Sequence, residues 1–324
     1  MAGRPTVRVV GVLRLATYNV NGIRAAQRRG FAGWKQRCLP DVACLQEVRC
    51  PYEALPMEAF AGFHVAYDAG ELKGRNGVAV LSRTPFDAVR VWSDQAMFIS
   101  PAGDARMAGA DELSVPDYPL ARPLRSFNHE GRYVEVDLAD QPLTVACVYV
   151  PKGDSLLAPG IRSRDPLTDE QLAGVQRRYD RKMAFLAGFS RHLTRARRAA
   201  HAAGREFLVV GDFNIAHTRL DVKNWRPAQK ASGFLPEERA WLSEQLSPRT
   251  LVDVVRAAHP DQDGPYSWWS WMGQAFARDT GWRIDYHLPS PQLARRSARA
   301  FVDRDHGADE RVSDHAAVVV DYDL

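Results

Sequence analysis

The sequence predicts an α/β fold. Short apolar runs rich in valine alternate with amphipathic segments of helical period along the 324-residue chain. Many of these runs end at a polar residue or at a turn that contains glycine or proline, as strands do when they leave a sheet. With 45% hydrophobic residues, the chain can bury a large core, and its length suits one large domain or two smaller ones.

The clearest strand signal covers residues 207–210, which are Phe-Leu-Val-Val, and it stops at Gly211. Asp212 and Asn214 follow, and alternation places their side chains on the same side of the chain. Ligands of open α/β sheets bind at the carboxyl ends of strands, so these residues are candidates for a site. The pattern alone also fits a strand that ends in a turn with an Asx cap. Its recurrence along the sequence favours the functional interpretation.

The first half of the chain contains most of the predicted strands. Residues 1–11 are expected to form a flexible lead-in, and residues 12–324 a single domain. A helix is predicted over residues 25–38, and strands are predicted at 13–20, 42–45, 78–82, 132–138 and 143–150. Residues 94–125 are rich in Gly, Pro, Ala and Asp and show no period, which predicts a long surface excursion.

The second half contains the strongest helix signal. Thr168 and Gln171 form a capping box, and Gly204 suits the position just after the helix. The Arg-rich outer face of this helix fits either a solvated surface or a contact with nucleic acid. Further along, the pattern predicts a helix at 236–246 and strands at 282–288 and 316–322. Each half opens with a strand followed by an acid, which suggests two similar halves that meet near 150–165.

Composition restricts the cellular setting. The net charge of +4, with Arg far more frequent than Lys, permits a partner that carries phosphates. The four cysteines show no Cys-x-x-Cys spacing, as expected for a reduced intracellular protein. No run is long and apolar enough for a signal peptide or a membrane span. We therefore expect a cytoplasmic protein, associated with the nucleoid in a prokaryote, that is not secreted and has no membrane partner.

Polar residues at the predicted strand ends make up the candidate site, and they are Asn19, Asn21, Glu47, Tyr149, Asp212, Asn214, Asp285, Asp314 and His315. Carboxylates and amides suit a hard cation such as Mg²⁺ or Mn²⁺, and the cysteine and histidine spacing does not suit structural zinc. A bound cation could polarise a phosphoryl oxygen, while an acid activates water and an imidazole held by a second acid contacts the phosphate.

Seven motifs cover nearly the whole chain: TYNVNGIR (17–24), LQE (45–47), GVAVLSR (77–83), VYVPKG (148–153), GDFNIAH (211–217), WRIDY (282–286) and SDH (313–315). In this order they resemble the exonuclease III family of abasic-site (AP) endonucleases, in the endonuclease/exonuclease/phosphatase superfamily. The resemblance implies a four-layer α/β sandwich, with two mixed β-sheets packed face to face and helices outside. It also implies metal-dependent cleavage 5′ to abasic sites, with 3′–5′ exonuclease and 3′-phosphodiesterase or phosphatase activity.

The resemblance also assigns roles around the metal. Glu47 is expected to be the principal ligand of Mg²⁺, with Mn²⁺ as a substitute, and Asn21 and Asp314 to lie at the same metal. Asn21 stands where some relatives have aspartate, which suggests a contact through water. Asp212 is expected to activate or orient the attacking water, and Asn214 to fix it. Whether one or two metal ions bind stays open.

The remaining expected roles concern the phosphate. His315, steadied by Asp285, is expected to contact the scissile phosphate, and Tyr149 and Asn19 to bind and orient it. The inferred substrate is double-stranded DNA with abasic sites or blocked 3′ ends, bound by a monomer.

Three further residues are expected to contact DNA. Trp268 lies where the family has an aromatic residue that lines the sugar pocket, Met272 could enter the groove, and Arg75 replaces an aromatic residue in a DNA-contacting loop. Tryptophans of the 268–272 run could instead fill the core. Two other functions fit the sequence: a nonspecific deoxyribonuclease or other phosphodiesterase of the same fold, and a catalytically inactive DNA-binding protein.

Overall fold

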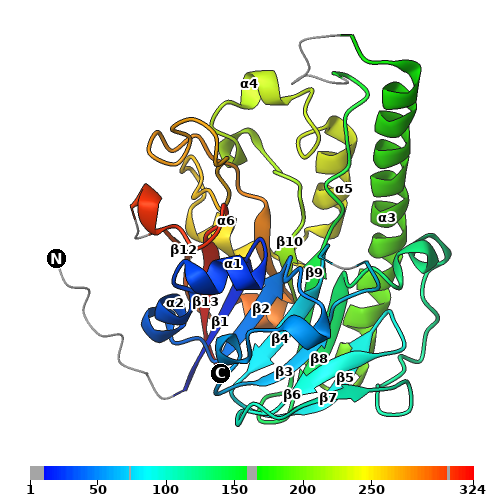
Figure 1. The fold of residues 1–324 in the computed structure, drawn as a ribbon, viewed down its shortest axis with the longest axis vertical. Coiled ribbons are helices and arrows are strands. Elements are labelled where there is room, and N and C mark those ends of the chain that lie inside the picture. The colour runs from blue at the N-terminus through cyan, green and yellow to red at the C-terminus, as the bar shows by residue number, and fades with distance from the viewer. Residues whose placement is uncertain (1–10, 73, 159–165, 305–306) are drawn as a thin grey trace.

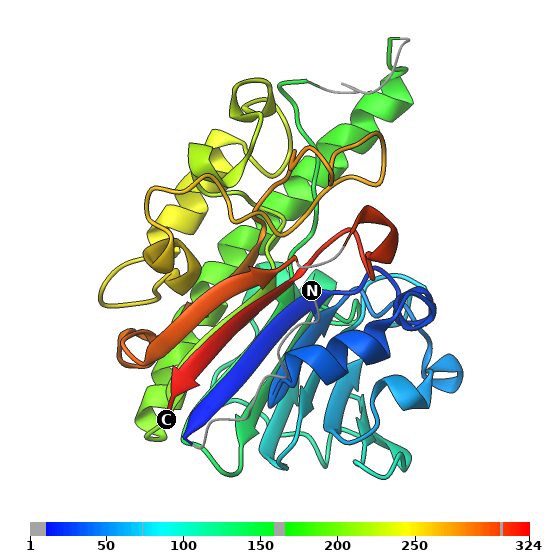
Figure 2. The ribbon, with the colours of Figure 1, turned by 90° about the vertical axis from the view of Figure 1, so that its left-hand side faces the viewer.

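Two mixed β-sheets lie at the centre of the protein in the computed structural model, which describes residues 11–72, 74–158, 166–304 and 307–324 (Figure 1). The larger sheet has eight strands, in the order β12 (Ser297–Asp303), β13 (Ala317–Asp323), β1 (Val12–Asn19), β2 (Val42–Gln46), β4 (Val78–Ser82), β3 (His64–Asp68), β6 (Ala96–Ile99) and β7 (Ala105–Ala108). The smaller sheet has five, in the order β11 (Asp285–Pro289), β10 (Glu206–Asp212), β9 (Leu143–Tyr149), β8 (Tyr133–Leu138) and β5 (Phe86–Val91). Figure 2 shows the C-terminal strand β13 beside β1.

One parallel pair in each sheet brings strand ends together. β1 and β2 are parallel, with Asn19 opposite Gln46, and β9 and β10 are parallel, with Tyr149 opposite Asp212. One face of each of these strands is buried against the other sheet, with Leu15, Cys44, Val80, Val145 and Val210 among the side chains between the sheets. The carboxyl ends of both pairs therefore lie at one edge of the sandwich.

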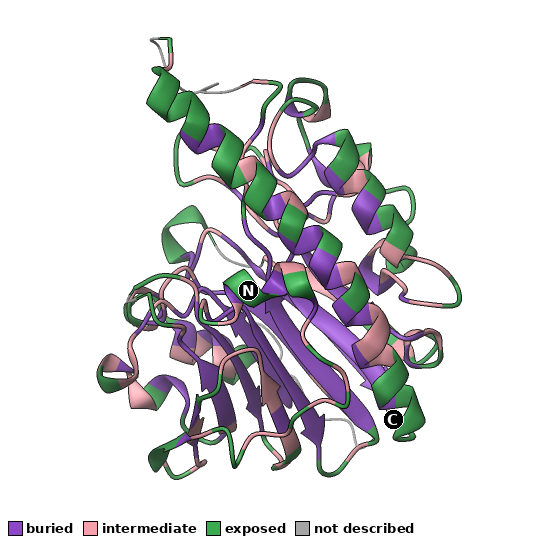
Figure 3. Ribbon diagram, turned by 90° about the vertical axis from the view of Figure 1, so that its right-hand side faces the viewer, coloured by how far each residue is buried: buried purple, intermediate pink, exposed green. Residues whose placement is uncertain are grey.

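Helices cover the outer face of each sheet. α1 (Ile23–Arg28) and α2 (Phe31–Cys38) pack on the larger sheet, while α3 (Asp169–Ala202) and α5 (Pro236–Gln245) pack on the smaller one. The first turns of α3 are mostly exposed where the helix extends past the strands (Figure 3). In the part of the chain that the structure describes, three short helices complete the α-helical elements, and they are α4 (Trp225–Ala228), α6 (Val254–Ala258) and α7 (Pro291–Ala294). The predicted four-layer α/β sandwich is confirmed.

Several element predictions need correction. The helix expected over 25–38 is two helices, because Gly30 adopts a left-handed φ of 103° between them. The strand expected to start at residue 282 starts at Asp285, and Trp282 makes only isolated bridges. Within residues 94–125, for which a long surface excursion without period is predicted, the structure forms β6 and β7 of the larger sheet, and the 3₁₀ helix η3 (Arg122–Phe127) begins there. These two strands have only four residues each, too few to establish a period.

Other predictions hold. Thr168 and Gln171 make both bonds of the capping box on α3, and Gly204 follows it with a left-handed φ of 71°. The flexibility of 1–11 and the meeting of two halves at 150–165 stay predictions, because residues 1–10 and 159–165 lie outside the described residues. Among the helices that the structure describes, none is long and apolar enough to cross a membrane.

Candidate active site

The polar strand ends meet at one edge of the sandwich. Asn19 ends β1, Glu47 follows β2, and Tyr149 and Asp212 end β9 and β10. β11 is antiparallel to β10, so its first residue, Asp285, lies opposite Asp212. Neighbouring loops supply Asn21, Asn214, Asp314 and His315. The edge therefore collects acids and amides from both sheets.

Asn19 connects the two sheets at this edge. Its buried Nδ2 donates to Glu47 Oε1 at 3.0 Å and to Asp212 Oδ2 at 2.9 Å. Its Oδ1 accepts the backbone N–H of Asn21 at 3.0 Å. One amide thus holds an acid from the larger sheet and an acid from the smaller sheet at a fixed separation.

Asp212 is oriented by the residue two positions on. Asn214 has a left-handed φ of 50°, which turns its backbone N–H toward Asp212 Oδ1 at 2.8 Å and its Nδ2 toward Oδ2 at 3.2 Å. Gly211 lets β10 lie close to β9, since a Cβ at this residue would collide with the Val148 carbonyl. Burial and the nearby charge of Asp285 raise the pKa of Asp212 to about 7. A carboxyl with such a pKa can accept a proton near neutral pH.

Asp285 holds the imidazole of His315. His315 Nδ1 lies 2.9 Å from Asp285 Oδ2, and its Nε2 lies 3.9 Å from Asp212 Oδ2. Burial acts to lower the pKa of His315, but the charges of Asp285, Asp212 and Asp314, with the hydrogen bond to Asp285, together outweigh burial and raise the pKa to about 10. The ring therefore carries a proton at neutral pH, and its Nε2–H is a donor that faces the acids.

The acids at this edge can hold a cation. Asp212, Asp285 and His315 each offer one ligand atom, and these atoms lie within 4.8 Å of one another. Asp285 Oδ1 is buried and has no hydrogen-bond partner among the described residues. A protonated imidazole has no free lone pair for a metal, so His315 fits this role less well than the carboxylates do.

A second group of oxygens contains the metal ligands expected from the sequence. Glu47 accepts the hydrogen bond from Asn19. Burial, together with the charges of Glu47 and Asp212, raises the pKa of Tyr149. The Tyr149 hydroxyl therefore stays protonated and is a donor to Glu47. Asn21 Nδ2 donates to Asp314 Oδ1 at 2.8 Å. These carboxylate and amide oxygens are the donors that Mg²⁺ prefers. The Arg49 guanidinium contacts Glu47 Oε2 and Asn21 Oδ1, so an ion fits at these oxygens once Arg49 moves aside.

A model of the endonuclease/exonuclease/phosphatase family matches residues 16–315. The chain belongs to this family. Among curated relatives, exodeoxyribonuclease III of Haemophilus influenzae is 26% identical over 321 residues, which cover 96% of this chain and 100% of that protein. DNA repair nuclease APEX1 of Danio rerio is 27% identical over 285 residues, which cover 87% of this chain and 74% of that protein.

Solved structures share the fold. An AP endonuclease from Archaeoglobus fulgidus is 24% identical with a TM-score of 0.66, and the match covers 96% of this chain and 100% of that one. A 3′–5′ exonuclease from Neisseria meningitidis is 23% identical with a TM-score of 0.67 and the same coverage. The likeness to AP endonucleases and exonuclease III predicted from the motifs is confirmed.

Two arginines in this family member were not predicted. Arg49 forms an ion pair with Glu47 Oε2 and donates to Asn21 Oδ1 at 2.6 Å. Its position two residues after Glu47 is a signal that could have revealed it. Arg132 donates to the carbonyl of Tyr149 at 3.0 Å and lies 5.1 Å from the centre of its ring. Nothing local in the sequence links Arg132 to Tyr149.

Of the three expected DNA contacts, one lies against the acids and two lie at the surface. Trp268 is half-buried, forms a bridge with His315, and donates its indole N–H to Asp314 Oδ2 at 3.1 Å. Met272 is 69% exposed, so it does not fill the core. Arg75 is exposed on a turn whose next residue, Asn76, accepts a backbone hydrogen bond from Arg49. The structure thus puts Trp268 against the acids, and Met272 and Arg75 at the surface.

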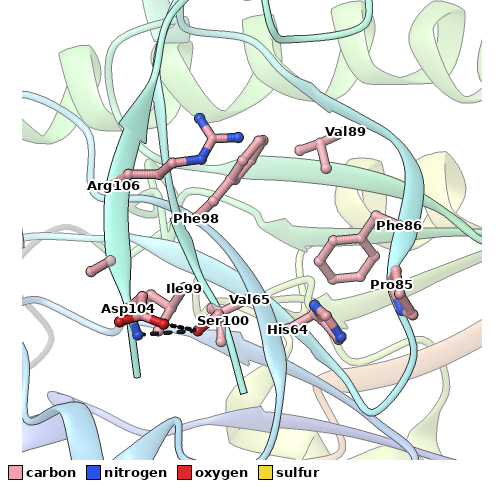
Figure 4. A pocket seen from close by; sticks show the side chains of 11 residues that line it. His64, Val65, Pro85, Phe86, Val89, Phe98, Ile99, Ser100, Asp104 and Arg106 are labelled. Atoms are coloured by element: carbon pink, nitrogen blue, oxygen red, sulfur yellow. Dashed lines mark hydrogen bonds between the residues drawn. The ribbon is translucent and has the colours of Figure 1, made fainter. Parts of the chain in front are cut away.

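A pocket of about 440 Å³ lies at the other end of the strands (Figure 4). Phe86, Val89 and Phe98 line it, with His64 and Arg106 beside them. His64 pairs with Ser82, which in turn pairs with Val42 at the start of β2, whereas Glu47 follows the end of that strand. This pocket is therefore separate from the acids.

Proposed function

We propose that the protein is a metal-dependent DNA repair nuclease that hydrolyses the phosphodiester 5′ to abasic sites. We infer 3′–5′ exonuclease and 3′-phosphodiesterase or phosphatase activity at the same site. The observation that carries the proposal is the placement of Asp212 and the Asp285–His315 pair next to Glu47, with Asn19 bonded across the two sheets. This arrangement combines a base, a cationic donor and a metal-binding acid at one edge.

Glu47, Asn21 and Asp314 would hold Mg²⁺, or Mn²⁺ in its place, and the bound ion would polarise a phosphoryl oxygen and stabilise the departing oxyanion. Asp212 accepts a proton from the attacking water, because its pKa of about 7 leaves a substantial fraction ionised at neutral pH. Asn214 keeps that carboxylate in place through its two bonds to Asp212.

The phosphate lies against hydrogen-bond donors in this proposal. His315 donates its Nε2–H to a phosphate oxygen, and Asp285 keeps the imidazole charged and oriented. Tyr149 and Asn19 orient the phosphate from the β9 and β1 strand ends through the acids to which they donate, Glu47 and Asp212. The His315 donor stabilises the charge that develops as water adds to phosphorus.

Trp268 is proposed to select the abasic nucleotide. A sugar without a base leaves the helix at little stacking cost, whereas a paired nucleotide must give up a few kcal/mol, and an aromatic wall leaves no room for a base. Met272 is exposed and could enter the groove as an apolar wedge. Arg75 supplies charge to the DNA backbone. We infer that the protein acts as a monomer in the cytoplasm, on the nucleoid in a prokaryote.

One incubation tests the proposal. The protein is mixed with a duplex that carries a single abasic site, with Mg²⁺ or with EDTA, beside the same duplex without the lesion. Cleavage 5′ to the lesion that needs the metal is the expected result. Degradation of both duplexes would favour a nonspecific deoxyribonuclease, and binding without cleavage would favour an inactive DNA-binding protein. A 3′-phosphate duplex in the same series measures the phosphatase activity.

A further inference from the structure

A fully buried ion pair lies behind Asn214. Lys182 of α3 and Glu238 of α5 face each other with Nζ and Oε1 2.6 Å apart, and neither side chain is exposed to solvent. Burying two charges costs desolvation energy, and the attraction between them often only offsets that cost. A gain in stability is therefore a weak explanation for such a pair. Its contacts indicate a further role.

The Lys182 ammonium uses its three hydrogens on three different segments. Besides Glu238, Nζ donates to the carbonyl of Asn214 at 2.8 Å and to the carbonyl of Lys152 at 3.1 Å. Lys152 follows β9 and Asn214 follows β10, the two strands that carry Tyr149 and Asp212. An ammonium has no donor beyond these three, so its hydrogen-bonding capacity is filled.

Glu238 anchors the lysine from the other side. Its Oε2 accepts the backbone N–H groups of Gly233 at 2.7 Å and of Leu235 at 3.0 Å. Gly153 leaves room for the lysine stem, since a Cβ there would lie 2.5 Å from Lys182 Cδ. The ammonium is therefore fixed by α5 and by the loop after β9, and it holds the Asn214 carbonyl from a fixed point.

Several contacts hold Asn214 in its backbone conformation. Its left-handed φ of 50° is sparsely populated outside glycine, although asparagine adopts it more readily than most residues. Its backbone N–H and Nδ2 bind Asp212, Nδ2 also donates to the Val150 carbonyl at 3.0 Å, and its own carbonyl accepts from Lys182. Without the ammonium, the peptide can relax, and Asp212 then loses the donors that orient it.

We propose that Lys182 is a positioning residue for hydrolysis, which keeps Asn214 left-handed and thereby keeps Asp212 aimed at the reacting phosphate. It touches neither substrate nor metal. The inference rests on the proposed function, since Asp212 and Asn214 are its catalytic and water-fixing groups. Displacement of a reacting group by about 1 Å can cost ~10²-fold in rate, which sets the expected effect.

The test compares two variants that differ only at residue 182. Glu238→Gln keeps the lysine and an acceptor for Gly233 and Leu235 but removes the buried counter-charge, so it is the reference against which the loss of the ammonium is measured. The double variant K182M/E238Q also removes the ammonium, while no unpaired charge stays buried. Each variant is assayed for melting temperature, for affinity toward the abasic duplex in EDTA, and for single-turnover cleavage at saturating protein with Mg²⁺.

We expect K182M/E238Q to cut ~10²-fold more slowly than the wild type, and E238Q, which keeps the ammonium without its counter-charge, to fall between the two, with DNA affinity unchanged in both. Amide exchange of Asn214 should accelerate most in the double variant. If the double variant fails to fold, Gly153→Ala displaces the lysine by contact and should give a smaller loss of the same kind. Retention of both the rate and the amide protection without Lys182 would overturn the inference.

Failure of the proposed function is distinguishable. A wild-type protein that cuts no DNA would reject that function, and the amide exchange of Asn214 would still decide whether Lys182 holds this peptide. An affinity loss that matches the rate loss would also overturn the inference, because a positioning residue acts on the chemical step.

Discussion

Replacing Asp285 with asparagine should make cleavage sensitive to pH near neutrality. The substitution preserves the shape of the side chain but removes the charge that lies 2.9 Å from His315 Nδ1. In the native protein, burial lowers the pKa of His315, and Asp285 is the largest of the charges that raise it to about 10. In Asp285→Asn, burial is opposed only by Asp212 and Asp314, so the pKa should fall to or below its ordinary value of about 6.5.

The size of the effect follows from that shift. A change from about 10 to 6.5 corresponds to roughly 5 kcal/mol at ~1.4 kcal/mol per pKa unit. Since the folded pKa of His315 is raised, its stabilising contribution is complete below pH ~6.5 and is lost as pH rises through about 10. The variant should therefore be less stable than the wild type at pH 7.

The cleavage rate of Asp285→Asn should also be lower than that of the wild type at pH 7. At pH 7 most of the imidazole in Asp285→Asn is neutral, and its donation to phosphate weakens, which predicts a ~10–10²-fold slower single-turnover rate. The loss should shrink toward pH 5.5 as the ring regains its proton. His315→Ala is the control, because it lacks the group and should show no such recovery. Parallel pH profiles for Asp285→Asn and the wild type would refute the assignment of His315 as a charged donor.

Three further substitutions test the remaining roles. Glu47→Gln should raise the Mg²⁺ concentration that half-saturates cleavage and lower the rate at saturation, and an unchanged metal titration would remove Glu47 from the metal site. Asp212→Asn should bind the abasic duplex normally in a gel shift but cut it ~10²–10⁴-fold more slowly, and a matching loss of affinity would contradict its role as a base. Trp268→Ala should reduce abasic-site incision several-fold while 3′-phosphate removal and melting temperature change less; a loss of about 3–5 kcal/mol in stability with all activities lowered together would show that it fills the core.

The candidate site could be predicted because its signals are local. A short apolar run followed at once by an acid or amide, as at Asp212 and Glu47, locates both a strand and the edge where it ends. The short outer strands β6 and β7 gave no such signal, since four residues at a partly exposed edge show no clear alternation. Whether such a short edge segment forms a strand depends on its pairing with the neighbouring strand, and not on its own residues.

The residues that hold the site in place could not be predicted in the same way. Lys182 lies in an Arg-rich helix, where the sequence indicates a solvated face, yet its side chain is fully buried. Only the packing of α3 against α5 turns it inward, toward Glu238 and the Asn214 carbonyl. Arg132 likewise reaches Tyr149 only because β8 and β9 pair. Such contacts depend on tertiary structure and leave no periodic trace.

The separation between Glu47 and Asp212 is a property of the packing between the sheets. The two acids follow strands in different sheets, and beneath them Gln46 of the larger sheet donates from Nε2 to Cys147 Sγ of the smaller one at 3.1 Å. Cys147 Sγ also lies 3.5 Å from the Leu45 carbonyl, so the sheets make polar contact directly under the site. A larger side chain at Cys147 would push the sheets apart, because close-packed cores have little free space. The Asn19 amide could then no longer reach both acids, which is why core packing at this level sets the geometry of the proposed chemistry.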